Sequence, residues 1–256
     1  MDILKLDGIS KYFLGLKAVE NVSFSIKQGE IFSLIGPNGA GKTTLFNIIS
    51  GHYSPTKGRK YFEGKDITNL RDYEVAQKGI TRTFQNIRLF SNLTVLENVL
   101  IGLHIKLKSS ILDCLLRNNK NKKEEDECYD EALELLDTIG LKGKAFEQAK
   151  NLSYGEQRKL EIVRALASKP KLLLLDEPTA GMNNFEAKEI VQYIKDLNST
   201  GLTILLIEHN MRVVMGVSNN IVVLNYGEKI AHGTASEIQK NELVIEAYLG
   251  RSKKND

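Results

Sequence analysis

The stretch Gly36-Pro-Asn-Gly-Ala-Gly-Lys-Thr-Thr44 follows a short apolar run, Ile31 to Ile35, and precedes apolar residues at helical spacing. It matches the pattern G-x-x-x-x-G-K-[ST], in which backbone N–H groups of a glycine-rich loop surround phosphate oxygens. The glycines permit sharp turns, and the start of the next helix adds the positive end of its dipole. We therefore expect a strand, a phosphate-binding loop and a helix, with nucleotide contacts from Gly36, Pro37, Asn38, Gly39, Ala40, Gly41, Lys42, Thr43 and Thr44.

A second motif places two carboxylates at the end of an apolar strand. Leu172 to Leu175 are followed directly by Asp176 and Glu177, and adjacent charges at the end of a buried strand are costly unless something uses them. Beside a phosphate loop, they predict catalysis with ATP and Mg²⁺. Lys42 would reach the β and γ phosphates, Thr43 and Asp176 would hold the hard Mg²⁺ ion, and Glu177 would act as general base.

Composition narrows the class of protein. The chain has 256 residues, enough for one large core or one core with a small subdomain, and its formal charge of +3 is too small to indicate nucleic acid as a partner. Cys114 and Cys128 have neither disulfide-framework nor metal spacing, which favours a reducing compartment. The first residues do not resemble a signal peptide, and no apolar run approaches the roughly 18 residues of a membrane span. We expect a soluble protein in the cytoplasm.

Two basic segments stand apart from the motifs. Arg117 to Lys123 precede the acidic run Glu124 to Glu127, so they can be a linker before an acidic helix start, or a basic segment that favours anionic lipid headgroups. The last segment, with Arg251, Lys253 and Lys254, is interpreted as a solvated terminus.

Periodicity along the chain predicts an α/β fold. Short strands are expected at Ile3–Leu6, Val22–Ile26, Ile31–Ile35 and Lys60–Phe62, and the first part of the chain therefore contains an antiparallel β patch. Between about 86 and 151 helical spacing dominates, with a stripe of Ala132, Leu135, Leu136 and Ile139 that ends at Gly140. Helices at Glu156–Ser168 and Ala187–Asn198 then alternate with strands at Lys171–Leu175, Thr203–Ile207 and Ile221–Leu224.

Nearly continuous apolar strands alternating with helices imply a mainly parallel sheet that helices cover on both faces. In such sheets, functional groups lie at the carboxyl ends of strands, where Gly36, Asp176 and His209 all fall. We expect an ATP-binding core with its antiparallel β subdomain in residues 1–86 and 152–230, a helical subdomain in 87–151, and a C-terminal helix with a basic tail in 231–256.

Leu152-Ser-Tyr-Gly-Glu156 opens the helix that leads into the acidic strand. With this order of motifs, the chain resembles the nucleotide-binding subunit of an ATP-binding cassette (ABC) transporter over nearly its whole length, including the RecA-like core. The resemblance implies that Ser153 and Gly155 contact nucleotide held by a second subunit. It also implies that Gln85 joins Mg²⁺ and senses the γ-phosphate, that His209 bridges this phosphate and the partner, and that Phe13, or its neighbour Tyr12, stacks on adenine.

Three positions depart from the family pattern. Tyr154 and Glu156 replace a glycine and the glutamine of LSGGQ, and Asn183 falls near the expected aspartate of the loop after Pro178. The serine and glycine that touch phosphate are retained, so hydrolysis is still expected. Within the family, the chain looks most like the ATPase of high-affinity branched-chain amino-acid uptake systems, a resemblance carried by Arg82–Phe90, Leu93–Val99, Glu208–Met211 and Glu246–Gly250.

The resemblance implies several partners: integral membrane permease subunits, a second cassette that is a copy or a paralogue, and a periplasmic or extracellular substrate-binding protein. The chain would then lie peripherally on the cytoplasmic face of the membrane. Two alternatives remain at this point, the ATPase of lipopolysaccharide export and a soluble cassette acting on nucleic acid or ribosomes. The second is disfavoured because the chain has one phosphate loop and a short insertion without sustained heptads.

Overall fold

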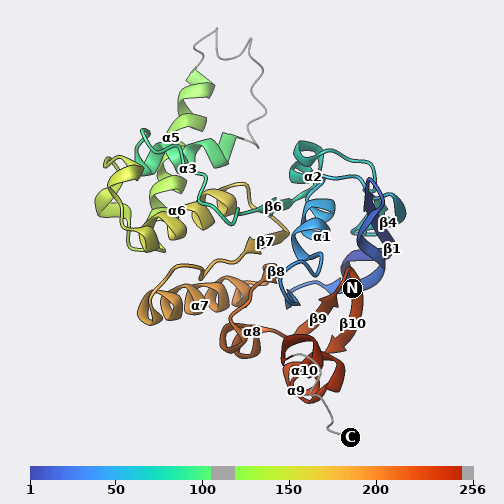
Figure 1. Ribbon diagram of the computed structural model, residues 1–256. Coiled ribbons are helices and arrows are strands. Elements are labelled where there is room, and N and C mark those ends of the chain that lie inside the picture. Colours follow the sequence, from blue (N-terminus) through green and yellow to red (C-terminus); the bar gives the residue numbers. More distant parts are fainter. Residues whose placement is uncertain (105–118, 250–256) are drawn as a thin grey trace, which may run out of the picture.

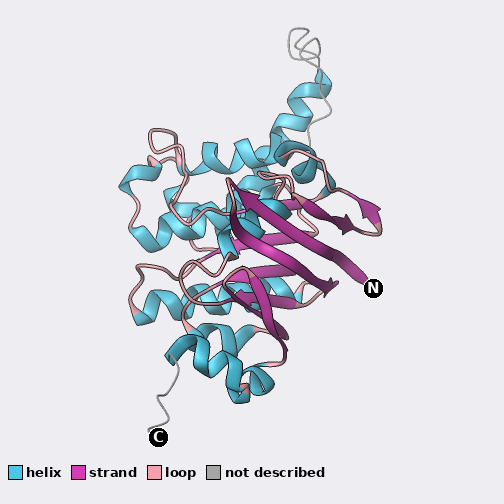
Figure 2. Ribbon diagram, turned by 45° about the vertical axis from the view of Figure 1, so that its right-hand side comes forward, coloured by secondary structure: helices cyan, strands magenta, loops and turns pink. Residues whose placement is uncertain are grey.

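The computed structural model describes residues 1–104 and 119–249, which form two β-sheets and surrounding helices (Figures 1 and 2). The larger sheet has the order β10-β9-β3-β8-β7-β6. Its neighbouring strands are parallel except for the β9–β10 hairpin at one edge, which is antiparallel. The predicted mainly parallel sheet is confirmed. Its strands are β3 (Ile31–Ile35), β6 (Ile80–Arg82), β7 (Leu172–Asp176), β8 (Thr203–Ile207), β9 (Asn220–Asn225) and β10 (Glu228–Gly233).

Both faces of this sheet are covered, which explains why β7 is apolar along its length. Successive side chains of a strand point to opposite faces. Leu172 and Leu174 pack in the cluster that contains helix α1 (Lys42–Ile49). Leu173 and Leu175 pack on the other face, against the helices α6 (Tyr154–Ala167), α7 (Asn184–Ser199) and α8 (Met211–Val217).

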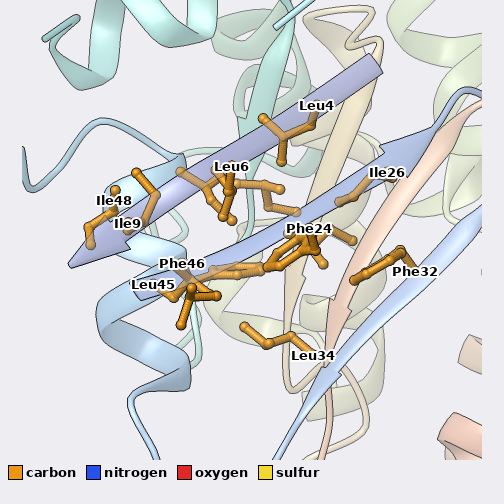
Figure 3. Close-up of a cluster of buried hydrophobic side chains, with 14 of the residues drawn as sticks. Leu4, Leu6, Ile9, Phe24, Ile26, Phe32, Leu34, Leu45, Phe46 and Ile48 are labelled. Atoms are coloured by element: carbon orange, nitrogen blue, oxygen red, sulfur yellow. The ribbon is translucent and has the colours of Figure 1, made fainter. Parts of the chain in front are cut away.

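The second sheet is antiparallel, with the order β2-β1-β4-β5, and packs on α1 and β3. Figure 3 shows Leu6 of β1 and Phe24 of β2 directed toward Phe46 of α1. The predicted antiparallel patch is confirmed, but its strands are longer than expected, because the hairpin continues past the apolar core with polar residues whose alternation is irregular. The strands are β1 (Asp2–Phe13), β2 (Leu16–Lys27), β4 (Lys57–Phe62) and β5 (Lys65–Asp66).

Helices α3 (Val95–His104) and α5 (Asn119–Asp137) share a separate apolar cluster with α6. Ala132, Leu136 and Ile139 of the predicted stripe are buried in it, and Gly140 has the left-handed φ of 72° expected after a helix end. Two 3₁₀ turns, Lys142–Lys144 and Ala149–Asn151, lead into α6. Because α6 also packs on β7, this helix joins the helical region to the sheet.

Four short elements were not expected from the sequence, because each has only three to seven residues: α2 (Asp72–Lys78), α8 and the edge strands β6 and β10. The predicted C-terminal helix is present as two short helices, α9 (Ala235–Lys240) and α10 (Glu242–Leu249). Cys114, the start of the basic run at Arg117, and the tail residues Arg251, Lys253 and Lys254 lie outside the described residues. Within 1–104 and 119–249, no helix combines the length and apolar character that a membrane crossing requires.

Candidate functional site

The predicted phosphate loop runs from the end of β3 to the start of α1 in backbone geometry that requires glycine. Gly36, Gly39 and Gly41 have φ values of 153°, 79° and 99°. A Cβ atom on Gly36 would lie 2.2 Å from the Leu224 carbonyl oxygen, and one on Gly41 would lie 2.5 Å from that of Ala18. No heavy atom lies within 4 Å of a Cβ on Gly39. Two of the glycines therefore provide space, and the third is required for its backbone conformation alone.

Lys42 places a cation in the loop. It is the first residue of α1, it is 8% exposed, and its Nζ donates to the carbonyl oxygens of Gly36 at 2.7 Å and Pro37 at 3.0 Å. Burial lowers the pKa of Lys42, and the nearby carboxylates of Glu177 and Asp176 oppose this shift. The Lys42 ammonium group in the loop therefore interacts electrostatically with both predicted acids, Asp176 and Glu177.

Asp176 lies at the carboxyl end of β7 and is held by an arginine that the sequence analysis missed. Arg82 Nη2 donates to Asp176 Oδ2 at 2.9 Å from the end of the neighbouring strand, β6. Burial raises the pKa of Asp176, and the Arg82 guanidinium opposes the rise. The sequence did mark Arg82 as a basic residue in the segment that resembles the family. Its place beside Asp176 was hidden because β6 has only three residues and was not expected as a strand.

Gln85, Glu177 and His209, which the sequence analysis assigned to catalysis, meet at this edge of the sheet. Gln85 Nε2 donates to Glu177 Oε2 at 3.1 Å, and His209 Nδ1 lies 3.6 Å from the same oxygen. Glu177 has a left-handed φ of 47°, and its N–H donates to the Ile207 carbonyl at the end of β8. A bulky residue in this region of φ is strained, a feature that clusters at functional sites.

A cleft of about 700 Å³ contains most of these groups. Tyr226 was missed by the sequence analysis, because nothing in the sequence links the β9–β10 turn to the phosphate loop. Among the described residues, the predicted site residues that stand outside the lining are Phe13, Gly36, Pro37, Ser153, Gly155, Asp176 and His209. The lining consists of Leu16, Lys17, Ala18, Asn38, Gly39, Ala40, Gly41, Lys42, Thr43, Thr44, Gln85, Glu177 and Tyr226.

The two aromatic candidates for adenine stacking differ in their surroundings. The Tyr12 hydroxyl donates to Glu20 Oε1 at 2.8 Å, which fixes this side chain within the hairpin. Phe13 is 37% exposed and meets the ring of Tyr53 edge-on, with 5.5 Å between ring centroids. Phe13 is therefore the more accessible of the two.

Ser153 and Gly155 lie at the N-terminal end of α6. Ser153 is exposed and forms a capping box with Glu156, whose Oε1 also accepts from Lys144 Nζ at 2.7 Å. Gly155 is buried, and a Cβ there would lie 3.2 Å from Glu186 Oε1. Asn183 caps α7 by accepting from the N–H groups of Phe185 and Glu186. Two of the three departures from the family pattern, Glu156 and Asn183, therefore have local structural roles.

Comparison with known proteins identifies the class of this chain. Residues 19–180 match the model of the family described as ABC transporter, and residues 228–254 match the model described as branched-chain amino acid ATP-binding cassette transporter. The chain therefore belongs to the ABC transporter family, as the order of its motifs predicted.

Individual relatives show which kind of ABC transporter protein the chain is most similar to among those compared. The chain is 45% identical to the high-affinity branched-chain amino acid transport ATP-binding protein LivG of Salmonella typhimurium, over 98% of each chain. It is 37% identical, with a TM-score of 0.85 over 98% of this chain and 100% of the other, to the ADP conformation of an ATP-binding cassette of an ABC transporter. A dimeric cassette in a post-hydrolysis state, bound to ADP and Pi, is 31% identical, with a TM-score of 0.77 over 91% of this chain and 98% of that one.

Proposed function

We propose that this chain is the ATPase subunit of a transporter, and that it binds and hydrolyses ATP to drive a separate membrane permease. The observation that carries the proposal is the single cleft that joins the phosphate loop and Lys42 to Gln85 and Glu177. A phosphate-binding site beside a carboxylate that can accept a proton is the arrangement that phosphoryl transfer to water requires.

In this mechanism the loop amides and Lys42 bind the β and γ phosphates and orient the terminal phosphorus. Glu177 accepts the proton of the attacking water, and Gln85 and His209, both directed at Glu177 Oε2, hold that carboxylate and the water in line. The donor set of Thr43, Asp176 and Gln85 is all oxygen and includes one carboxylate, which fits Mg²⁺ better than a softer metal. When bound there, Mg²⁺ neutralises phosphate charge.

The cleft is completed in this proposal by a second cassette, a copy or a paralogue. Ser153 and Gly155 stand outside the cleft of their own subunit, at the N-terminal end of a 14-residue helix. Such a helix end attracts phosphate. We assign them to the nucleotide of the opposite subunit, and Phe13 to the adenine of its own subunit. The dimeric relative with ADP and Pi supports a two-subunit arrangement.

We infer that the cargo is a branched-chain amino acid, because relatives that match 98% of this chain carry branched-chain amino acid transport in their names. The complex would include permease subunits and a substrate-binding protein outside the cell, and this chain would lie on the cytoplasmic face of the membrane. A groove of about 520 Å³ adjoins the cleft and shares Thr43 and Gln85 with it. Its exposed residues His52, Asp72, Asn86 and Arg88 form the proposed permease contact.

Two measurements test the proposal. The purified chain should hydrolyse ATP with Mg²⁺, and Lys42→Ala should abolish both nucleotide binding and hydrolysis. Cells that lack the chain should lose uptake of labelled leucine, isoleucine and valine but keep uptake of an unrelated amino acid, and only a hydrolysis-competent chain should restore it. Unchanged leucine uptake in those cells would refute the assigned cargo, and absence of hydrolysis would refute the ATPase itself.

A further inference from the structure

The segment from Phe84 to Arg88, which contains Gln85, is held by side chains rather than by a strand or a helix. It follows β6 and has no regular secondary structure. Unpaired backbone groups away from water are costly, so such a segment needs other partners. Within the described residues, no backbone-to-backbone hydrogen bond involves positions 84–88. The partners come instead from one helix, α6.

Arg158 and Glu161 supply most of these hydrogen bonds. Arg158 Nη1 donates to the Phe84 carbonyl at 2.7 Å, and Nη2 donates to the Gln85 carbonyl at 2.8 Å. Glu161 Oε1 accepts from the N–H groups of Phe84 at 3.4 Å and Arg88 at 3.2 Å. One turn further along α6, Arg164 donates to the Arg88 carbonyl. We call Arg158, Glu161 and Arg164 the α6 clamp.

The first two residues of the clamp are a buried ion pair. The Arg158 and Glu161 side chains are 0% and 1% exposed, and Nη1 lies 2.9 Å from Oε2. A buried pair of charges is weak evidence for a gain in stability, because desolvation offsets the attraction, and apolar residues of similar size often serve as well. The planar fork of arginine does suit two carbonyl oxygens at fixed positions. The pair is therefore suited to holding the segment from Phe84 to Arg88 in place, rather than to raising the free energy of unfolding.

The same helix begins at the proposed contact with the opposite subunit. Ser153 caps α6 five residues before Arg158, and Tyr154, one of the departures from the family pattern, lies between them. The Tyr154 hydroxyl is 3.3 Å from Arg158 Nη2, and its ring borders Gly181 in the loop before α7. Helix α6 therefore connects Ser153 to Arg158, and Arg158 contacts Gln85, whose Nε2 donates to Glu177 Oε2.

We propose that Arg158, paired with Glu161, is a positioning residue that couples the two nucleotide sites, by fixing Gln85 relative to the end of α6 that meets the opposite subunit. This inference rests on the proposed function, because the role of Ser153 belongs to it. Nucleotide bound at Ser153 of one subunit then shifts α6, and the clamp moves Gln85 against Glu177 in the site of that same subunit.

The test is the double variant Arg158→Met/Glu161→Leu, which leaves no unpaired buried charge. The matched control is Lys159→Met/Glu189→Leu, which removes a partly exposed ion pair between α6 and α7. Hydrogen exchange of the amides of Phe84 and Arg88 should accelerate in the double variant and stay unchanged in the control, with or without nucleotide. Binding of ATP should stay within about a factor of three, while kcat falls about tenfold or more and the Hill coefficient for ATP approaches one.

Unchanged exchange at Phe84 and Arg88, or a kcat that falls only as far as thermal stability does, would overturn the proposal. Arg158→Lys keeps the charge beside Glu161 without the fork, so it should reproduce the loss of kcat without lowering the Tm; full activity of this variant would also count against the clamp. If the wild-type chain neither binds nor hydrolyses ATP, the proposed function is wrong, and the coupling of two nucleotide sites is wrong with it. The hydrogen-exchange data test the α6 clamp independently, because they are measured with and without nucleotide.

Discussion

The amide of Gln85 donates to Glu177 Oε2 at 3.1 Å, a contact that joins residues 92 positions apart in the sequence. It exists because β6 and β7 are parallel neighbours, so the segments that follow them leave the sheet side by side. A carboxylate held in this way has a defined direction toward the cleft. The contact joins the proposed sensor of the γ-phosphate directly to the proposed base.

We expect Glu177→Gln to bind ATP normally and to hydrolyse it about a hundredfold to ten-thousandfold more slowly, because an amide cannot accept the proton of the attacking water. Since nucleotide would no longer turn over, a dimer with ATP between the subunits should accumulate. Size-exclusion chromatography with ATP and Mg²⁺ measures this, and Glu134→Gln, at an exposed position of α5, is the control for loss of a charge outside the cleft. Near-normal hydrolysis by Glu177→Gln would remove Glu177 from the role of base.

The chemical centre could be predicted because its residues lie at marked places in the sequence. Glycines in a fixed pattern identify the loop, and Asp176 and Glu177 end a run of four leucines. Arg82, Arg158 and Glu161 could not be identified in the same way. The i,i+3 spacing of Arg158 and Glu161 indicates an ion pair on α6 but not its burial. The other partners of these residues, and the partners of Arg82, come from distant segments, and no spacing within one element reveals such contacts.

The fold was predictable where burial is strong and repeated. Strands β7 and β8 are buried at all five positions and appear as continuous apolar runs. By contrast, β10 is an edge strand with no buried residue, so its sequence does not distinguish it from a loop. The prediction truncated the long hairpin of β1 and β2 because its outer half contributes only Ile9 and Val19 to the apolar core, and the residues near its tip are exposed.

We expect Ser153→Arg to abolish hydrolysis and leave ATP binding by the monomer nearly intact, because Ser153 lies outside the cleft of its own subunit. Ser153 also caps α6, and losing a cap costs about 1 kcal/mol. Ser153→Ala is therefore the matched control, since it removes the cap without adding a bulky charge. Equilibrium binding of a fluorescent nucleotide and steady-state hydrolysis should be compared. Loss of binding in monomeric Ser153→Arg would contradict the two-subunit site.

A pH dependence follows from Lys60, which is fully buried in β4 and donates to the Ile48 carbonyl at the end of α1 at 2.7 Å. Burial lowers the pKa of Lys60 from 10.5 to about 8, a shift worth ~3 kcal/mol. Between these two values the unfolded chain binds more protons, so this residue makes the free energy of unfolding rise with pH. Below pH 8 both states are protonated, and the full cost of burying the charge is present.

Lys60→Met should therefore differ from the wild type most below pH 8, and the difference should shrink by up to ~3 kcal/mol as the pH rises to 10.5. Urea unfolding of both proteins at pH 7 and pH 10 measures it. Comparing the two proteins cancels the titration of groups that they share, and Lys5→Met, on the exposed side of β1, controls for loss of a surface lysine. A constant difference across this range of pH would rule out a buried cationic Lys60.

The groove that we assign to the permease gives the last prediction. The Arg88 side chain is exposed at its edge and lies over the Phe84 ring, 4.3 Å from the centroid, so the charge faces outward while the backbone stays in the α6 clamp. A charge at the rim of an interface affects association more than chemistry. Arg88→Glu should weaken permease binding or amino-acid uptake several-fold, while the ATPase of the free chain stays within about a factor of two.

Both activities should be measured on the same preparations, with hydrolysis by the free chain and uptake by the assembled complex. Lys5→Glu reverses a charge on the smaller sheet, away from the groove, and should change neither activity. An equal loss of hydrolysis and uptake in Arg88→Glu would mean that the substitution disturbs Gln85 through the clamp rather than the permease contact. Unchanged uptake would exclude this groove from the path by which hydrolysis drives transport.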